Sequence, residues 1–314
     1  MIIQIQDSFD EINIDKKKAL MYKQNHKMNY SEYKKIHDII MKKNLIKLAV
    51  CYDFDGTLAP GNMQEYGFLR TLKTTPGSFW AKSDELAQNQ CADKNLAYML
   101  TMLTEAKNKN ISFRREDLQK FGQDITLFRG VDDWFKRINA YALKNGVELQ
   151  HFLLSSGLKE IVEGMPISKE FTKVYACSFM YDANGVAFWP AQVVNYTTKT
   201  QYLYRISKGC LDEADMAVND RTPQSERDIP FSQMVYIGDG MTDIPCMATL
   251  RKFGGHAIAV YRPHTKTGSK NAEKLLKDGR VDNIAPADYS EGGKMDTLIK
   301  ALIRKVRSDN DFKS

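Results

Sequence analysis

The sequence predicts an α/β protein in which helices cover both faces of a parallel β-sheet. The chain has 314 residues, of which 43% are hydrophobic and 27% are charged, as in a globular protein long enough for two domains. Nearly continuous apolar runs, which are typical of strands covered on both faces, alternate with helical patterns. This alternation indicates βαβ units and a parallel sheet.

Five apolar runs predict the strands of the sheet: residues 45–52, 147–154, 174–179, 234–237 and 257–261. Helical patterns over 131–144 and 198–206 lie between them and stop near Gly146 and Gly209, because glycine readily adopts the left-handed conformation that ends a helix. A turn-forming stretch at 182–185 follows the third strand and predicts a β-hairpin.

The alternation is interrupted between the first two strands. Residues 60–128 contain no convincing strand. Their apolar spacing predicts amphipathic helices within 84–109 and, after a cap at Ser112, at 116–121, where Gly122 ends the second helix. We therefore expect a helical insertion at this point of the sheet.

The first 44 residues are expected to form a basic extension. Residues 1–50 hold ten lysines and six acidic residues, so they account for +4 of the net charge of +6. A basic arm can bind nucleic acid, but acids are interspersed among these lysines, and the segment has no Gly/Arg repeat, stacked-aromatic module or zinc motif. A solvated leader, or a surface helix that begins at Ser31, is the favoured interpretation, and nucleic acid is not an expected partner.

Membrane insertion and secretion are disfavoured by the sequence. Its apolar runs are far shorter than the ~20 residues that a membrane-spanning helix needs, and Asp7, Asp10 and Glu11 stand where a signal peptide would be basic and then apolar. The five cysteines are an odd number without a C-x-x-C pair, which argues against a disulfide framework or a Cys-rich zinc site. We expect a cytoplasmic protein.

The strongest chemical motif follows the first strand directly. Asp53 and Asp55 are two residues apart, so their side chains leave the strand on the same side, at the sheet edge where α/β proteins bind ligands. One carboxylate can attack as a nucleophile while the other moves protons. Gly56 permits a tight turn and a close approach of backbone N–H groups to an anion. Taken alone, a D-x-D-G motif can also be an ordinary polar turn.

A second acidic cluster follows the fourth strand. Gly238, Asp239, Gly240 and Asp243 repeat the arrangement of an apolar strand followed by glycine-spaced acids. Carboxylates from two strand ends of one sheet offer the oxygen ligands that Mg²⁺ takes in small number, together with waters and substrate phosphate oxygens. The two clusters together predict a Mg²⁺ site.

Two weaker motifs lie after the second strand and at a helix start. Ser155, Ser156 and Gly157 offer hydroxyl and N–H groups that can bind phosphate at a helix N-terminus, although an ordinary serine N-cap has the same appearance. Lys199 begins a predicted helix, where a lysine is usually solvated. Neither motif specifies a function by itself.

In this order, the four motifs resemble those of the haloacid dehalogenase-like hydrolases, over roughly residues 47–259. The resemblance implies a Rossmann-like three-layer core, formed by residues 45–59 and 129–314, with residues 60–128 as an inserted type-1 helical cap. The serine-rich motif is most similar to the phosphoserine-phosphatase-like members. The acidic residue that those enzymes place soon after the first motif is absent, since Glu65 lies several positions farther along.

The resemblance also implies roles for the motif residues. Asp53 corresponds to the nucleophile that forms an aspartyl-phosphate, and Asp55 to the general acid and base. Ser155, with the amides of Ser156 and Gly157, would hold the phosphoryl oxygens.

The metal site and its surroundings follow from the same resemblance. Mg²⁺ would bind the Asp53 carboxylate, the Asp55 carbonyl oxygen and the Asp239 carboxylate. Lys199 would neutralise charge on the phosphoryl group and on Asp53, and Asp243 would orient a water or Lys199 without binding the metal.

The activity implied is that of a Mg²⁺-dependent phosphatase acting on a small phosphorylated metabolite. Family dehalogenases lack an acid two residues after the nucleophile, and family ion pumps carry a lysine next to it, so Asp55 favours a phosphatase or a phosphomutase. A phosphotransferase or phosphomutase stays open as an alternative. So does a binding protein that keeps the fold as a scaffold tethered by its basic N-terminus, although the presence of the complete motif set favours an enzyme.

Three basic residues of the insertion are further candidates for substrate binding. Lys82, Arg114 and Arg115 in the insertion are candidates for clamping a second anionic group, with surface charge as the simpler interpretation. His151 falls inside the second predicted strand and is expected to be a buried residue with satisfied hydrogen bonds.

Overall fold

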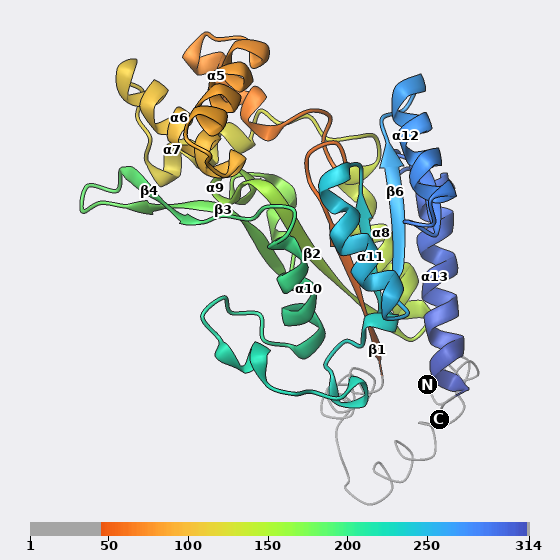
Figure 1. Ribbon diagram of the computed structural model, residues 1–314. Helices are drawn as coiled ribbons and strands as arrows, with labels where there is room; N and C mark the ends of the chain where they lie inside the picture. Colours follow the sequence, from red (N-terminus) through yellow and green to blue (C-terminus); the bar gives the residue numbers. More distant parts are fainter. Residues whose placement is uncertain (1–44, 313–314) are drawn as a thin grey trace, which may run out of the picture. The chain divides into compact units, whose positions relative to one another are not determined.

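The computed structural model describes residues 45–312, so the basic extension and the helix expected from Ser31 lie outside the described residues. Its strands form one seven-stranded sheet in the order β4-β3-β2-β1-β5-β6-β7 (Figure 1). All neighbouring strands are parallel except β3 and β4. The strands are β1 (Ile46–Tyr52), β2 (Val147–Leu158), β3 (Lys173–Tyr181), β4 (Ala187–Gln192), β5 (Met234–Gly238), β6 (His256–Tyr261) and β7 (Asn283–Pro286).

Helices cover both faces of this sheet (Figure 1). On one face, α8 (Val131–Lys144) and α13 (Lys294–Asp311) pack against each other and against β2 and β1. On the other face, α10 (Lys199–Lys208) packs against α11 (Ile244–Lys252), and α12 (Lys266–Lys277) packs against β6 and β7. The predicted α/β class with a three-layer core is confirmed.

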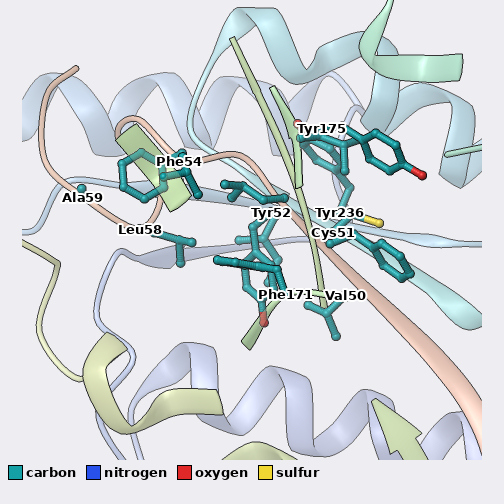
Figure 2. Packing of buried hydrophobic residues seen from close by; sticks show 14 of the residues in the cluster. Val50, Cys51, Tyr52, Phe54, Leu58, Ala59, Phe171, Tyr175 and Tyr236 are labelled. Atoms are coloured by element: carbon teal, nitrogen blue, oxygen red, sulfur yellow. The ribbon is translucent and has the colours of Figure 1, made fainter. Parts of the chain in front are cut away.

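The central strand β1 explains why the acidic motif is held rigidly. Every residue of β1 from Leu48 to Tyr52 is fully buried, as its continuous apolar sequence predicts. Figure 2 shows Val50, Cys51 and Tyr52 together with Phe54, which lies between Asp53 and Asp55 in sequence and is itself fully buried. The apolar ring therefore anchors the loop that carries the two acids.

The hairpin predicted after the third strand is present. β3 and β4 are antiparallel, the Asp182 amide donates to the Val186 carbonyl at 3.0 Å, and Gly185 occupies the left-handed region with φ +74°. The helices expected over 131–144 and 198–206 correspond to α8 and α10. The strand β7 was not predicted, because four residues carry too little periodicity to be distinguished from a loop.

The insertion is helical but differs in detail from the prediction. It contains a 3₁₀ turn (Met63–Glu65), α4 (Gly67–Leu72), α5 (Pro76–Asn89), α6 (Lys94–Asn108) and α7 (Arg115–Gly122). The range 84–109 is broken, because Cys91 adopts a left-handed φ of +49° and the Asp93 side chain caps α6 by accepting from the amides of Asn95 and Leu96.

Two predicted boundaries were wrong. Ser112 does not cap a helix; its hydroxyl donates to the Asp117 side chain, and α7 begins at Arg115. The second strand does not end at Leu154 but continues to Leu158, which pairs with β3 beyond an irregularity in the register. The short helix α9 (Lys159–Glu163) follows it and packs against α7.

His151 lies in the core, as predicted, with 2% of its surface exposed. With the ring proton on Nε2, each polar atom has a partner: Trp134 Nε1 donates to the Tyr52 hydroxyl at 2.9 Å, which donates to His151 Nδ1 at 3.1 Å. His151 Nε2 then donates to Asn139 Oδ1 at 2.8 Å. Burial lowers the pKa of His151 to about 3, so the ring is neutral at physiological pH.

This buried histidine makes the fold sensitive to acid. Between pH 6.5 and 3 the unfolded chain binds a proton at this residue and the folded chain does not, so the free energy of unfolding falls as the pH falls. From pH 7 to 5 the loss amounts to about 2 kcal/mol. Urea denaturation at pH 7 and at pH 5 measures this change. The free energy of unfolding should fall less in His151→Gln than in the natural sequence, by about 2 kcal/mol. Equal losses in the two proteins would contradict the assignment.

Candidate active site

The predicted motifs meet at one edge of the sheet. Because β1, β2 and β5 are parallel, their carboxyl ends lie together, and the motifs follow those ends. The Asp53 amide donates to the Ile237 carbonyl at 2.9 Å, which joins the end of β1 to β5. Asp239 comes directly after β5, so two acidic clusters separated by almost two hundred residues become neighbours.

Lys199 connects the two clusters. Its Nζ donates to Asp53 Oδ1 at 2.7 Å and to Asp243 Oδ1 at 2.9 Å. The Tyr236 hydroxyl, from β5, donates to the same Asp243 oxygen at 2.7 Å. Lys199 is 1% exposed and Asp243 is fully buried. The lysine is therefore not a solvated helix residue; α10 places its charge in the interior beside Asp53.

The electrostatics of this cluster follow from crowding charges inside the protein. Burial works against the ammonium charge of Lys199, but the carboxylates of Asp243 and Asp53 outweigh it and hold the pKa of Lys199 above its ordinary value. Burial and the charge of Asp243 raise the pKa of Asp53, and Lys199 opposes that rise. The lysine is thus the group that favours the ionised, nucleophilic form of Asp53.

Asp55 and Asp239 line the same cavity as Asp53. The Met63 amide donates to Asp55 Oδ1 at 2.8 Å, while burial and the charge of Asp53 raise the pKa of Asp55 well above its ordinary range. Asp239 is exposed to solvent, but protein atoms surround part of its side chain. The protein around it, and then the charges of Asp53 and Asp243, raise its pKa as well.

Gly56 is required by this arrangement. Its φ of +77° is a conformation that other residues rarely adopt, and a Cβ there would lie 2.1 Å from Asp239 Oδ2. The absence of a side chain lets the loop after β1 approach the second acidic cluster.

These acids fit a divalent cation. Carboxylate oxygens of Asp53, Asp239 and Asp243 lie within 4.8 Å of one another, and a cation among them would offset their mutual repulsion. Both oxygens of Asp243 already accept hydrogen bonds, Oδ1 from Lys199 and Tyr236 and Oδ2 from the Gly240 amide at 3.2 Å. Asp53 and Asp239 are therefore the two carboxylates better placed to bind a metal.

A cavity of about 410 Å³ opens onto the cluster. The lining residues are Asp53, Asp55, Gly56, Pro60, Gly61, Asn62, Asn95, Phe128, Ser156, Lys199, Asp239, Thr242 and Arg262. Of the predicted serine motif, Ser156 lines this cavity, whereas Ser155 is fully buried. The Gly157 amide donates to Ser155 Oγ at 3.0 Å, so in this conformation these two residues bind each other.

A smaller cavity of about 220 Å³ adjoins the first beneath the insertion. Asp55 and Ser156 belong to both, and Trp80 and Tyr98 add aromatic walls. The Tyr98 hydroxyl donates to the Ser156 carbonyl at 2.8 Å. Because Asp55 lines it, this cavity can accommodate part of a leaving group.

Lys82, Arg114 and Arg115 of the insertion line neither of these cavities. Lys82 forms an ion pair with Glu105. Arg115 lies 3.7 Å from Glu163 and over the Tyr181 ring, and Arg114 lies 4.0 Å from Glu116.

Sequence reasoning did not identify Arg262, Asn62 or Tyr236 as parts of the site. Arg262 and Asn62 line the larger cavity, and Tyr236 contacts Asp243. A signal existed for Arg262, because it follows a predicted strand directly. Asn62 lies in a loop, and Tyr236 looks like any apolar strand residue.

A family model for the haloacid dehalogenase-like hydrolases matches residues 50–248. The chain belongs to this family. The matched range begins in β1 and ends in α11, so it includes all four motifs and the insertion. The family predicted from the order of the motifs is confirmed.

One relative by sequence and two solved structures are similar to this hydrolase. An uncharacterized protein of Borreliella burgdorferi is 28% identical over 281 residues, covering 81% of this chain and 95% of the relative. The crystal structure of a probable phosphoserine phosphatase from Vibrio cholerae matches with a TM-score of 0.53 at 12% identity, over 89% of this chain and 74% of that one. A haloacid dehalogenase family hydrolase from Salmonella enterica serovar Typhi matches at 0.50 and 13%, over 88% and 81%. At such identities the two structures share the fold.

Among residues 45–312, none of the helices combines the length and the apolar character needed to cross a lipid bilayer.

Proposed function

We propose that this hydrolase is a Mg²⁺-dependent phosphatase that cleaves a small phosphomonoester through an aspartyl-phosphate on Asp53. The observation that carries the proposal is the pairing of Asp53 with Lys199 inside a cavity that Asp55 and Asp239 also line. A carboxylate held by a buried lysine beside a second carboxyl group has the two functions that phosphoryl transfer through a protein nucleophile requires.

In the first half-reaction, an oxygen of Asp53 attacks phosphorus and the bond from phosphorus to the leaving oxygen breaks. Asp55, whose raised pKa favours a protonated carboxyl group, donates its proton to the leaving oxygen. Lys199 keeps its positive charge beside Asp53 and the phosphoryl oxygens while negative charge redistributes.

In the second half-reaction, Asp55 is ionised and accepts a proton from a water that attacks phosphorus. The bond from phosphorus to Asp53 then breaks, inorganic phosphate leaves, and both carboxyl groups return to their starting states. Ser156, at the wall of the cavity, is the member of the serine motif positioned to contact the phosphoryl group, and Ser155 with the Gly157 amide supports its loop.

Bound Mg²⁺ would neutralise charge between the nucleophile and the phosphoryl oxygens. The groups proposed to hold it are the carboxylates of Asp53 and Asp239 and the main-chain carbonyl of Asp55. Asp243 is proposed to position Lys199, because its oxygens already accept hydrogen bonds from Lys199, Tyr236 and the Gly240 amide.

The test of this function is metal-dependent release of phosphate. Dialysis against EDTA should reduce hydrolysis of 4-nitrophenyl phosphate to background, and added Mg²⁺ should restore it. Mg²⁺ should also raise the thermal unfolding temperature, since a ligand that binds the folded state stabilises it. Asp239→Asn should lose both responses. The exposed Asp132→Asn in the first turn of α8 is the matched control and should keep both.

Undiminished turnover in chelator would be the first result to contradict the proposal. Transfer of the phosphoryl group to an alcohol without release of inorganic phosphate would be the second. The second would favour a phosphotransferase or phosphomutase. A protein that binds Mg²⁺ but turns over no phosphomonoester in a broad panel would favour the scaffold interpretation.

A further inference from the structure

Two arginines lie beside the catalytic cavity without a carboxylate partner. Arg262 directly follows β6, and Arg70 lies in α4 of the insertion. Both are exposed, and among the described side chains no hydrogen bond or ion pair engages either guanidinium. They come from segments separated by almost two hundred residues, so their proximity is a product of the tertiary fold.

Both arginines line one further cavity of about 330 Å³, together with Pro60, Gly61, Glu65, Tyr66 and Pro76. This outer cavity shares Pro60, Gly61 and Arg262 with the catalytic cavity. One molecule can therefore occupy both, with its reacting phosphoryl group at Asp53 and another group near the arginines.

The charge of the outer cavity is positive. Glu65 is its one acidic residue, and Glu65 Oε1 is already occupied by Asn62 Nδ2 at 2.6 Å and by Trp80 Nε1 at 2.8 Å. Both arginines line this cavity with Tyr66, and the Arg70 guanidinium carbon lies 6.0 Å from the Tyr66 ring centroid. Burial and the charges of Asp55 and Glu65 raise the pKa of Tyr66, and the charges of Arg262 and Arg70 oppose that rise.

The two lysines that line the catalytic cavity and the smaller cavity already form ion pairs with carboxylates. Lys199 pairs with Asp53 and Asp243. Lys94, at the smaller cavity beneath the insertion, pairs with Asp84 at 2.9 Å. The outer cavity is therefore the place where a second anion on the substrate meets cations that no carboxylate has paired.

We propose that Arg70 and Arg262 form a second anion subsite, and that the substrate is therefore a phosphomonoester whose leaving group carries a further phosphate or carboxylate. This inference rests on the proposed phosphatase function and adds the substrate class to it. It replaces Lys82, Arg114 and Arg115 as the residues for that role, because these three have acidic partners of their own.

Matched substrate pairs test the subsite. 3-Phosphoglycerate and glycerol 3-phosphate differ in one carboxylate, and fructose 1,6-bisphosphate and fructose 6-phosphate differ in one phosphate. In at least one pair, we expect the natural protein to have a higher kcat/KM for the member that carries the second anionic group. Which pair shows the preference identifies the second anion as carboxylate or phosphate.

The variants Arg70→Gln and Arg262→Gln should each lower kcat/KM for the preferred substrate with a second anionic group. The decrease should be at least about tenfold, as loss of a charge-assisted hydrogen bond produces. In Arg70→Gln, turnover of 4-nitrophenyl phosphate, which carries no second anionic group, should stay within about twofold. Arg221→Gln, at an exposed arginine that lines none of the three cavities, is the control and should change neither value.

Three results would overturn the subsite. The first is that the natural protein shows no preference within either pair. The second is that the arginine variants leave the preference intact. The third is that Arg262→Gln lowers turnover of all substrates equally, including the aryl phosphate, in which case Arg262 contacts the transferred phosphoryl group.

Failure of the proposed function would be distinguishable, because it abolishes turnover of 4-nitrophenyl phosphate itself. In that event calorimetry with propane-1,3-bisphosphonate and propylphosphonate still tests the subsite. Tighter binding of the bisphosphonate, lost in the double arginine variant, supports it, and equal affinities overturn it.

Discussion

Replacement of Asp53 by asparagine should lower kcat for 4-nitrophenyl phosphate by roughly 10³-fold or more, equivalent to about 4 kcal/mol of activation free energy. An amide is a poor nucleophile toward phosphorus and carries no charge for Lys199 or a metal to engage. Steady-state assays at saturating Mg²⁺ measure the effect. The variant should form no covalent phosphoprotein, as detected by intact-protein mass spectrometry after rapid acid quenching.

The change is expected to remove chemistry and not the fold. Lys199 keeps Asp243 as a partner, and an amide at position 53 relieves repulsion within the acidic cluster, so thermal unfolding should remain cooperative. Asp132→Asn makes the same chemical change on the exposed surface of α8 and should keep full activity. If a folded Asp53→Asn protein retained more than a few per cent of turnover, Asp53 would not be the nucleophile.

Asp55→Asn should separate the two half-reactions. 4-Nitrophenolate leaves without needing a proton, so Asp53 can still be phosphorylated, although more slowly. Hydrolysis of the aspartyl-phosphate needs a base to take the proton of the attacking water. Asp55 lines the cavity beside Asp53 and can serve as this base, whereas Asp239 is proposed to hold Mg²⁺. We expect a burst of close to one nitrophenolate per protein, followed by turnover slower by about 10²-fold or more.

Leaving-group chemistry gives this prediction its control. An alkyl phosphate requires protonation of its leaving oxygen, so Asp55→Asn should impair alkyl phosphates more than aryl phosphates. Mass spectrometry during turnover should show the protein with one added phosphoryl group. Equal impairment of both substrate types, without a burst and without accumulated phosphoprotein, would remove Asp55 from the proton-transfer role.

The sequence was sufficient to predict the layers of this fold. The apolar run before Asp53 and the alternation with helical patterns depend on burial, and burial leaves a strong local record in residue type. The hairpin turn at 182–185 was also predictable, because Asp and Gly have turn chemistry that acts over a few residues.

Local sequence patterns did not predict the ends of helices and strands that depend on contacts with other segments. β2 continues to Leu158 because β3 offers it a pairing partner there, and nothing in the local sequence announces that partner. The break between α5 and α6 depends on Cys91 in a left-handed conformation and on the Asp93 cap, whereas the apolar spacing runs on across it. β7 exists because β6 pairs with it.

The four motifs together determined the family, and the two acidic ones determined the strand-end clusters and the expected Mg²⁺ chemistry. Such motifs are short, and the order Asp53, Ser155, Lys199 and Asp239 can be read directly from the sequence. The tertiary structure decided how those groups meet. It buried Lys199 between two carboxylates, turned Ser155 inward, and brought Arg70 and Arg262 to one cavity. Partnerships of this kind join residues far apart in the chain, so their geometry depends on packing and charge in three dimensions, which local sequence patterns do not record.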